Sequence, residues 1–130
     1  MSSSYLTAFN NHFSDFVDDI QSVFPNDPDI LTAKNSLALI RKANPRMIIK
    51  IWSSFIMSRY REQIEAGDID FFINKDYNSD VKDAEKSEKI MEAIDRLRGP
   101  VKMMSRENQE KSMKYMQNLC KICQLYESSA

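Results

Sequence analysis

The chain has 130 residues and a formal net charge of −1, and 42% of its residues are apolar. This length fits one domain, and the apolar share is large enough for a core, which excludes an intrinsically disordered chain. The near-zero net charge excludes an electrostatic attraction of the whole protein to nucleic acid or to a membrane surface.

The first predicted helix covers residues 4–24, where apolar side chains recur at steps of three and four residues. Asp27 followed by Pro28 is typical of an N-cap and the first residue of a helix, which predicts a second helix over residues 28–43. The two helices are expected to bury, in chain order, Phe9, Phe13, Phe16, Val17, Ile20, Ile30, Leu31, Leu37 and Ile40.

A third helix is predicted over residues 45–66, because Asn44 and Pro45 repeat the cap signal and Gly67 suits a C-terminal stop. Residues 68–79 fit either a short strand or a helical turn. Because a lone strand would have no partner in this sequence, we favour a short helix or an ordered loop.

Two further helices complete the prediction. One covers residues 80–98 and is ended by Gly99 and Pro100, and the other begins near residue 100 or 105 and reaches about residue 126. The last helix would bury Met113, Met116, Leu119, Cys120 and Cys123. The expected fold is all-α: a compact single-domain bundle of about five helices over residues 1–130, with a short irregular or strand-like segment near 68–79.

The expected location is intracellular and cytoplasmic, with a virion interior as an alternative. The N-terminus lacks the layout of a signal peptide, and the apolar stretch 48–57 is interrupted by Lys50 and is too short to span a bilayer. Cys120 and Cys123 do not make the disulfide framework of a secreted protein, and we interpret them as core cysteines.

Charge is segregated along the chain. Residues 1–30 carry five acids and no Lys or Arg, whereas residues 31–61 carry seven bases and no acid. The basic block has three interpretations: charge balance within the fold, docking of an acidic protein surface, and contact with nucleic-acid phosphates. The candidate partner-binding residues are Lys34, Arg41, Lys42, Arg46, Lys50, Arg59 and Arg61.

No catalytic site, metal site or cofactor is predicted. His12 is the only histidine, and no serine, cysteine or carboxylate is placed by sequence to form a triad with it. Residues 74–85 partly follow the spacing of a calcium-binding EF-hand loop, but Ser79 replaces the turn glycine and Lys82 adds positive charge. An enzyme would need an unrecognised carboxylate site around Asp68, Asp70 and Asp76.

Two strings, NPRMIIKIW at residues 44–52 and GDIDFFINKDY at residues 67–77, carry a resemblance to a group of viral proteins. They resemble small, mostly uncharacterised helical proteins of large DNA viruses that infect algae and protists. The resemblance covers roughly the first 80 residues. It implies assembly in cytoplasmic factories and a role as a virion component, and it supplies no functional residues.

The leading hypothesis is therefore a non-enzymatic protein–protein interaction or assembly protein, with a minor structural role in a viral particle. Its partner would be an acidic protein surface or another assembly protein, with Trp52 and Tyr60 as anchors if they are exposed. The alternative is a nucleic-acid-binding helical module that uses the basic segment 34–61.

Overall fold

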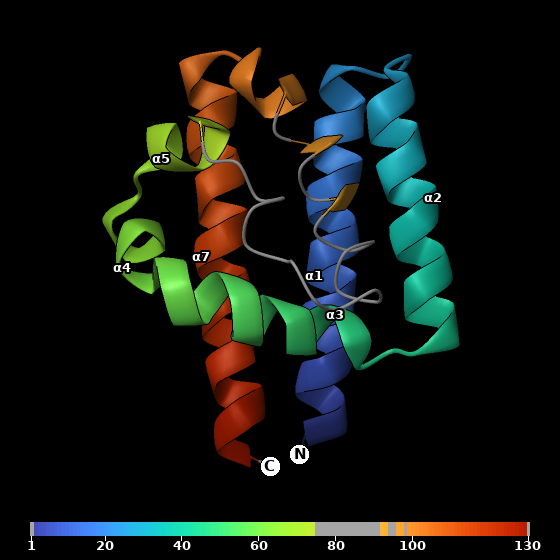
Figure 1. Ribbon diagram of the computed structural model, residues 1–130, viewed down its shortest axis with the longest axis vertical. Helices are drawn as coiled ribbons and strands as arrows, with labels where there is room; N and C mark the ends of the chain where they lie inside the picture. The colour runs from blue at the N-terminus through green and yellow to red at the C-terminus, as the bar shows by residue number, and fades with distance from the viewer. Residues whose placement is uncertain (1, 75–91, 94–95, 98, 130) are drawn as a thin grey trace.

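The computed structural model describes residues 2–74, 92–93, 96–97 and 99–129, and these residues form helices and turns without a strand (Figure 1). The all-α fold predicted from the sequence is confirmed. In chain order the elements are α1 (Ser2–Val23), α2 (Pro28–Ala43), α3 (Met47–Ile51), η1 (Trp52–Met57), α4 (Ser58–Ala66), α5 (Ile69–Asn74) and α7 (Arg106–Ser129).

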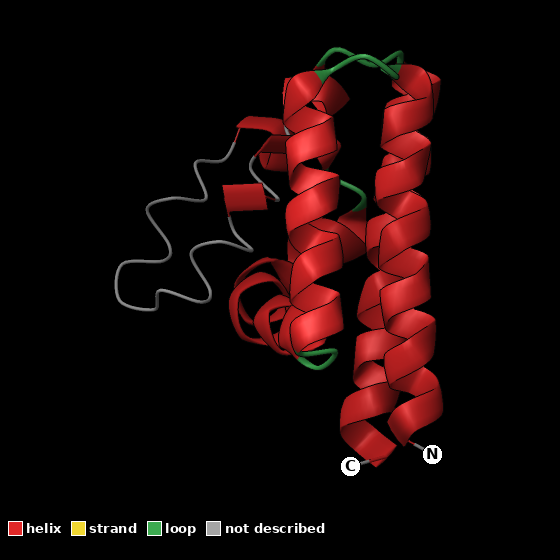
Figure 2. Cartoon of the chain, turned by 90° about the vertical axis from the view of Figure 1, so that its right-hand side faces the viewer, coloured by secondary structure: helices red, strands yellow, loops and turns green. Residues whose placement is uncertain are grey.

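The two longest helices, α1 and α7, lie side by side and run in opposite directions, so the two ends of the chain lie together (Figures 1 and 2). Phe16 stacks on Tyr115 with ring centroids 5.3 Å apart, and Lys111 Nζ lies 2.7 Å from Asp19 Oδ1. The apolar stripes predicted on both helices are confirmed as buried. They are Phe9, Phe13, Phe16, Val17 and Ile20 on α1, and Met113, Met116, Leu119, Cys120 and Cys123 on α7.

Helix α2 returns antiparallel beside α1, on the side of α1 away from α7 (Figure 1). The predicted cap is confirmed, because Asp27 Oδ1 accepts hydrogen bonds from the backbone N–H of Asp29 at 2.8 Å and of Ile30 at 3.3 Å. Leu37 is buried as predicted. Leu31 was expected to be buried too, but its side chain is 49% exposed because it lies on the outer face of α2.

The elements α3, η1 and α4 follow one another without a break and form a single helical rod, which crosses in front of α1 and α7 (Figure 1). The rod begins at Met47 and not at Pro45, since Asn44 Oδ1 accepts from the backbone N–H of Arg46 at 3.2 Å and holds a turn there. Its end is as predicted: Gly67 takes the left-handed conformation, with φ of 73°.

The rod buries both aromatic residues that were suggested as partner anchors, so that suggestion is wrong. Trp52 is 3% exposed and Tyr60 is 5% exposed. Trp52 packs against Phe9 and Phe13, with ring centroids 6.2 and 5.9 Å away, and Tyr60 packs against Phe71 at 5.5 Å. Both rings belong to the core because the apolar face of the rod is the face turned toward α1, α7 and α5.

Residues 69–74 form the short helix α5, so the helical interpretation of this stretch is confirmed and the strand interpretation is wrong. Asp68 Oδ1 accepts from the backbone N–H of Phe71 at 3.2 Å and caps the first turn. Most of the helix predicted over residues 80–98 lies outside the described residues, as do the EF-hand-like positions 75–85 and Asp76.

The backbone of residues 99 to 102 is helical, whereas residue 98, where the helix predicted over 80–98 would end, lies outside the described residues. Proline fixes φ near the helical value, and the Met103 N–H donates to Gly99 O at 3.2 Å. Helix α7 begins after Ser105, whose Oγ accepts from the backbone N–H of Asn108 at 3.2 Å. This cap selects the later of the two predicted starts.

Candidate partner-docking surface

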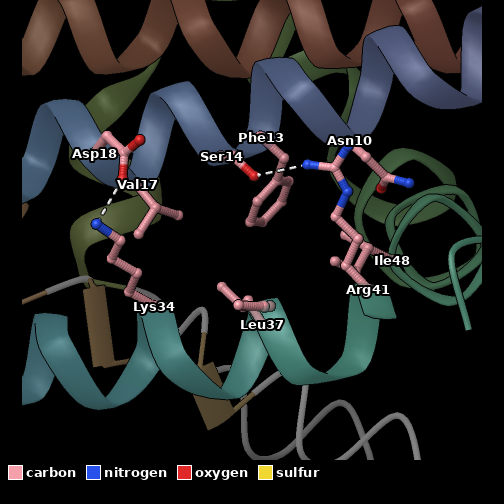
Figure 3. Close-up of a pocket in the computed structure, with 10 residues that line it drawn as sticks. Asn10, Phe13, Ser14, Val17, Asp18, Lys34, Leu37, Arg41 and Ile48 are labelled. Atoms are coloured by element: carbon pink, nitrogen blue, oxygen red, sulfur yellow. Dashed lines mark hydrogen bonds and ion pairs between the residues drawn. The ribbon is translucent and has the colours of Figure 1, made fainter. Parts of the chain in front are cut away.

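The seven bases of the segment 34–61 do not share one face. Lys34 and Arg41 lie on α2 and point toward α1 (Figure 3), whereas Arg59 and Arg61 lie on α4. The remaining three, Lys42, Arg46 and Lys50, lie where α2 ends and the rod begins. The three groups have different surroundings, and these surroundings decide which bases are available to a partner.

Lys34 is engaged within the fold. Its Nζ lies 3.0 Å from Asp18 Oδ1 (Figure 3). It also donates to Gln21 Oε1 at 2.8 Å, and both partners lie on α1. An exposed pair of this kind contributes roughly 0.2–1 kcal/mol. For Lys34 the pair supports the first interpretation of the basic block, which is charge balance within the fold. An acid of residues 1–30 here meets a base of residues 31–61.

Arg41 also binds α1, but through neutral groups. Its Nη1 donates to Ser14 Oγ at 3.2 Å and its Nη2 to Asn11 Oδ1 at 2.7 Å. The side chain is half-buried, and within the described part of the chain no carboxylate pairs with it. A guanidinium held only by neutral acceptors keeps its full positive charge available to an anion.

The bases on α4 have local partners. Arg61 Nε lies 3.1 Å from Glu65 Oε1, one helical turn along, and both side chains are exposed. The guanidinium of Arg59 lies 5.9 Å from the centroid of the Phe55 ring. Such contacts are worth a few tenths of a kcal/mol to about 1 kcal/mol each, and they hold these two cations along their own helix.

Lys42, Arg46 and Lys50 form what we call the basic corner. All three are exposed, and in the described ranges none of them forms an ion pair or a side-chain hydrogen bond. Residues 43–45, which lie between Lys42 and Arg46, are exposed as well. These cations therefore stand at a protruding turn with their charge uncompensated.

Two of the three cations of the basic corner are placed against helix stability, whereas Lys42 lies in the last turn of α2, where a cation is favourable. Arg46 and Lys50 are like charges four residues apart, and they lie at the positive end of the rod, whose first turn contains no acid. Each of these arrangements destabilises a helix by roughly 0.2–1 kcal/mol. A local arrangement that lowers stability without an evident compensating contact is expected at functional sites.

Beside the basic corner, α1 and α2 enclose a small cavity of about 140 Å³ (Figure 3). Its apolar wall consists of Phe13, Val17, Leu37, Ala38 and Ile48, and the ion-paired Asp18 and Lys34 also line it. It continues into an open groove whose edge includes Arg41, Lys42 and Pro45. The cavity and the groove have Asn10, Ser14, Ala38 and Arg41 in common.

Asn10 is the functional candidate that sequence reasoning missed. Its side chain is 3% exposed, and its Nδ2 donates to Pro45 O at 2.8 Å. This bond fixes the orientation of the amide, and the Oδ1 atom has no hydrogen-bond partner. The signal in the sequence was its position three residues before Phe13 and seven before Val17, which places a polar side chain on the apolar stripe.

The two cysteines are free thiols in the core. Burial is the main cause that raises the pKa of Cys120, and the neighbouring Trp52 partly opposes this rise. The geometry between the two groups is outside the range of an ordinary hydrogen bond, and the indole Nε1 of Trp52 has no other partner among the described residues. Burial, followed by the charge of Glu127, raises the pKa of Cys123 to about 12. Thiols with raised pKa values are poor nucleophiles and poor redox groups.

The remaining candidate catalytic side chains, His12, Asp68 and Asp70, contact other residues of the fold. The His12 ring lies 4.9 Å from the Tyr115 ring, between α1 and α7. Asp68 caps α5, and Asp70 Oδ1 lies 3.6 Å from Arg106 Nη1. Nowhere in the described residues do three or more His, Cys, Asp or Glu side chains gather as they would around a metal ion.

No protein-family model, curated protein or solved structure is detectably similar to the chain. Among the described helices, none combines the length and the apolar character needed to cross a membrane.

Proposed function

We propose that this protein is a non-enzymatic docking module that binds an acidic protein surface through the basic corner. One observation carries the proposal: Lys42, Arg46 and Lys50 are exposed before, in and after the turn between α2 and α3, without a partner in the described residues, while Lys34 and Arg61 of the same block form ion pairs. An acidic surface would supply the missing counter-charges.

The expected interaction is fast and sensitive to salt. Exposed ion pairs contribute little affinity each, and their main effect is to steer the approach of a partner and to fix its register. Screening shortens the reach of these charges to about 8 Å at physiological ionic strength. Stable docking therefore needs apolar contact in addition, and the groove between α1 and α2 lies next to the basic corner.

The non-enzymatic part of the proposal is supported by the state of the reactive groups. Both thiols have raised pKa values. Asp68 caps α5, and Asp70 lies near Arg106. A location in the cytoplasm, and a minor structural role in a viral particle, belong to the proposal too. The role in a viral particle rests on the sequence resemblance of residues 44–52 and 67–77 alone, and the location is supported in addition by the two free thiols.

Nucleic-acid binding is the second candidate function. The observation in its favour is that Arg46 and Lys50 lie at the positive end of a helical rod, where phosphate is also attracted. Three cations make a small footprint, however, and each phosphate contact would contribute about 0.9 to the slope of log affinity against log salt. A slope near −3 at most would be expected from the basic corner.

The test is fluorescence anisotropy of a labelled acidic peptide, and of labelled single- and double-stranded oligonucleotides, at low and near-physiological salt. The variant combines Lys42→Gln, Arg46→Gln and Lys50→Gln. The matched control combines Lys102→Gln, Lys114→Gln and Lys121→Gln, which removes the same charge from exposed lysines elsewhere.

We expect the peptide to bind the unchanged protein and the control, and to lose most of its affinity for the corner variant. Equal weakening by both variants would mean that only net charge matters and would overturn the assignment to the basic corner. Tight binding of the oligonucleotides without binding of the peptide would establish the second candidate function in place of the first.

A further inference from the structure

The cavity between α1 and α2 has the size of one medium apolar side chain. Its volume of about 140 Å³ is close to that of an engineered protein cavity that holds benzene. Five apolar side chains form one part of its wall, and Figure 3 shows Phe13 and Val17 from α1 facing Leu37 from α2 across it. An aliphatic side chain of a partner would be accommodated there without rebuilding the core.

One end of the cavity carries an available positive charge. Figure 3 shows Arg41 reaching from α2 to Ser14 beside Asn10, so that its guanidinium lies at the mouth of the cavity. Its acceptors are the neutral oxygens of Ser14 and Asn11, and the exposed Lys42 lines the adjoining groove. A carboxylate would replace these neutral acceptors with a charged one, and guanidinium binds carboxylates with two parallel hydrogen bonds.

The same end contains an acceptor that lacks a donor. Asn10 is almost completely buried, its Nδ2 is committed to Pro45 O, and its Oδ1 is without a partner. Buried polar atoms are nearly always hydrogen-bonded, so an unpaired one next to a cavity points to a missing donor. Because Arg41 lies beside this amide, its movement onto a bound anion would open a path to Oδ1.

We propose that the groove between α1 and α2 binds the carboxyl-terminal residue of the acidic partner polypeptide. The terminal carboxylate pairs with Arg41 and Lys42, the amide N–H of the last residue donates to Asn10 Oδ1, and its aliphatic side chain enters the cavity. A chain terminus combines these three groups within one residue, and capture of a terminal carboxylate is a recurring mode of peptide recognition. Acidic residues upstream would then reach Arg46 and Lys50.

This inference rests on the proposed function, because it names the part of the partner that docks. The test uses three fluorescein-labelled acidic peptides with the same upstream sequence: one ends in leucine with a free carboxylate, one ends in leucine carboxamide, and one ends in serine with a free carboxylate. Binding is measured by anisotropy at near-physiological salt.

We expect the carboxamide and the serine peptides each to bind about tenfold more weakly than the leucine acid. Arg41→Gln should weaken the leucine acid and leave the carboxamide unchanged, whereas Arg61→Gln should change neither. Ala38→Leu, which places a larger side chain at the mouth on an exposed position of α2, should weaken the leucine acid. Its control is Ala8→Leu, an exposed position on α1 away from the groove.

The outcomes separate the two proposals. Equal affinity of the leucine acid and its carboxamide, with both still weakened by loss of the basic corner, would overturn the terminal-residue inference and keep the docking function. An absence of binding by all three peptides at low salt would overturn both. A shift of the Asn10 side-chain amide resonances with the leucine acid and not with the carboxamide is the expected spectroscopic result.

Discussion

Asn10 on α1 donates from Nδ2 to the backbone carbonyl of Pro45, 2.8 Å away and 35 residues later in the chain. This is the bond that ties the turn of the basic corner to the core, because Asn10 is buried and Pro45 is exposed. The conformation of the basic corner therefore depends on Asn10, a residue of another helix. The segment 34–61 alone does not contain this residue, so its sequence could not indicate the dependence.

Asn10→Ala tests this tie. The substitution removes one side-chain hydrogen bond, and we expect it to lower the free energy of unfolding by about 1 kcal/mol, as measured by urea denaturation. The loss should be moderate, because the same change removes an unpaired buried oxygen. Thr7→Ala, one turn away on an exposed position, is the control and should stay within about 0.5 kcal/mol of the parent.

Asp27→Ala tests the cap that starts α2. Asp27 accepts two backbone N–H groups, and loss of such a cap typically destabilises a protein by about 1 kcal/mol. Asp27→Ser should retain most of the stability, because serine caps in the same way. If alanine and serine at this position gave the same urea midpoint, the cap would be structurally present but energetically irrelevant.

The sequence predicted the helices wherever the periodicity was long and the ends were chemically marked. Asp27 with Pro28, and Gly67, set boundaries through hydrogen bonds and backbone conformation, which are local properties. The π-helical η1 was not predictable, because π-helical turns are rare and the periodicity of the segment is that of an α-helix. The sequence left two starts open for the last helix, because a proline suits the first turn of a helix and Ser105 suits a cap.

The candidate site was only partly accessible from the sequence. The run of seven bases was visible, yet which of them are free depends on what α1 presents to α2. Lys34 meets Asp18 and Arg41 meets Ser14, both through tertiary contacts between helices. Asn10 carried no sequence signal of its own role, since its acceptor, Pro45 O, belongs to the backbone of a distant turn.

Cys123 supplies a prediction on pH. Its pKa is raised to about 12 from 9.0, mainly by burial, so the folded state holds a proton that the unfolded state releases above pH 9. The stabilisation is therefore complete below pH 9 and is lost as the pH rises from 9 toward 12. Urea midpoints measured across this range should fall with pH.

The control for this pH dependence is Cys123→Ala, whose urea midpoint should fall less steeply, whatever its absolute stability. Thiol reactivity gives an independent measurement. Both cysteines should react slowly with a neutral thiol reagent in the folded protein and quickly in urea. Rapid alkylation of Cys123 at neutral pH without denaturant would contradict its buried, protonated state.

Trp52 supplies the last prediction, because it is the only tryptophan and it is buried in the core against Phe9 and Phe13. Its fluorescence should report folding and not docking. We expect a clear red shift of the emission in urea and an unchanged maximum when the acidic peptide binds the basic corner.

Trp52→Phe should lower the free energy of unfolding by about 1–3 kcal/mol, because a smaller ring leaves a void among close-packed aromatic side chains. The variant should still bind the acidic peptide with unchanged affinity, since Trp52 lies in the core and the binding charges lie at Lys42, Arg46 and Lys50. A loss of peptide affinity in a variant that remains folded would mean that the partner reaches the core aromatic residues, which would place the docking surface across the rod and not at its start.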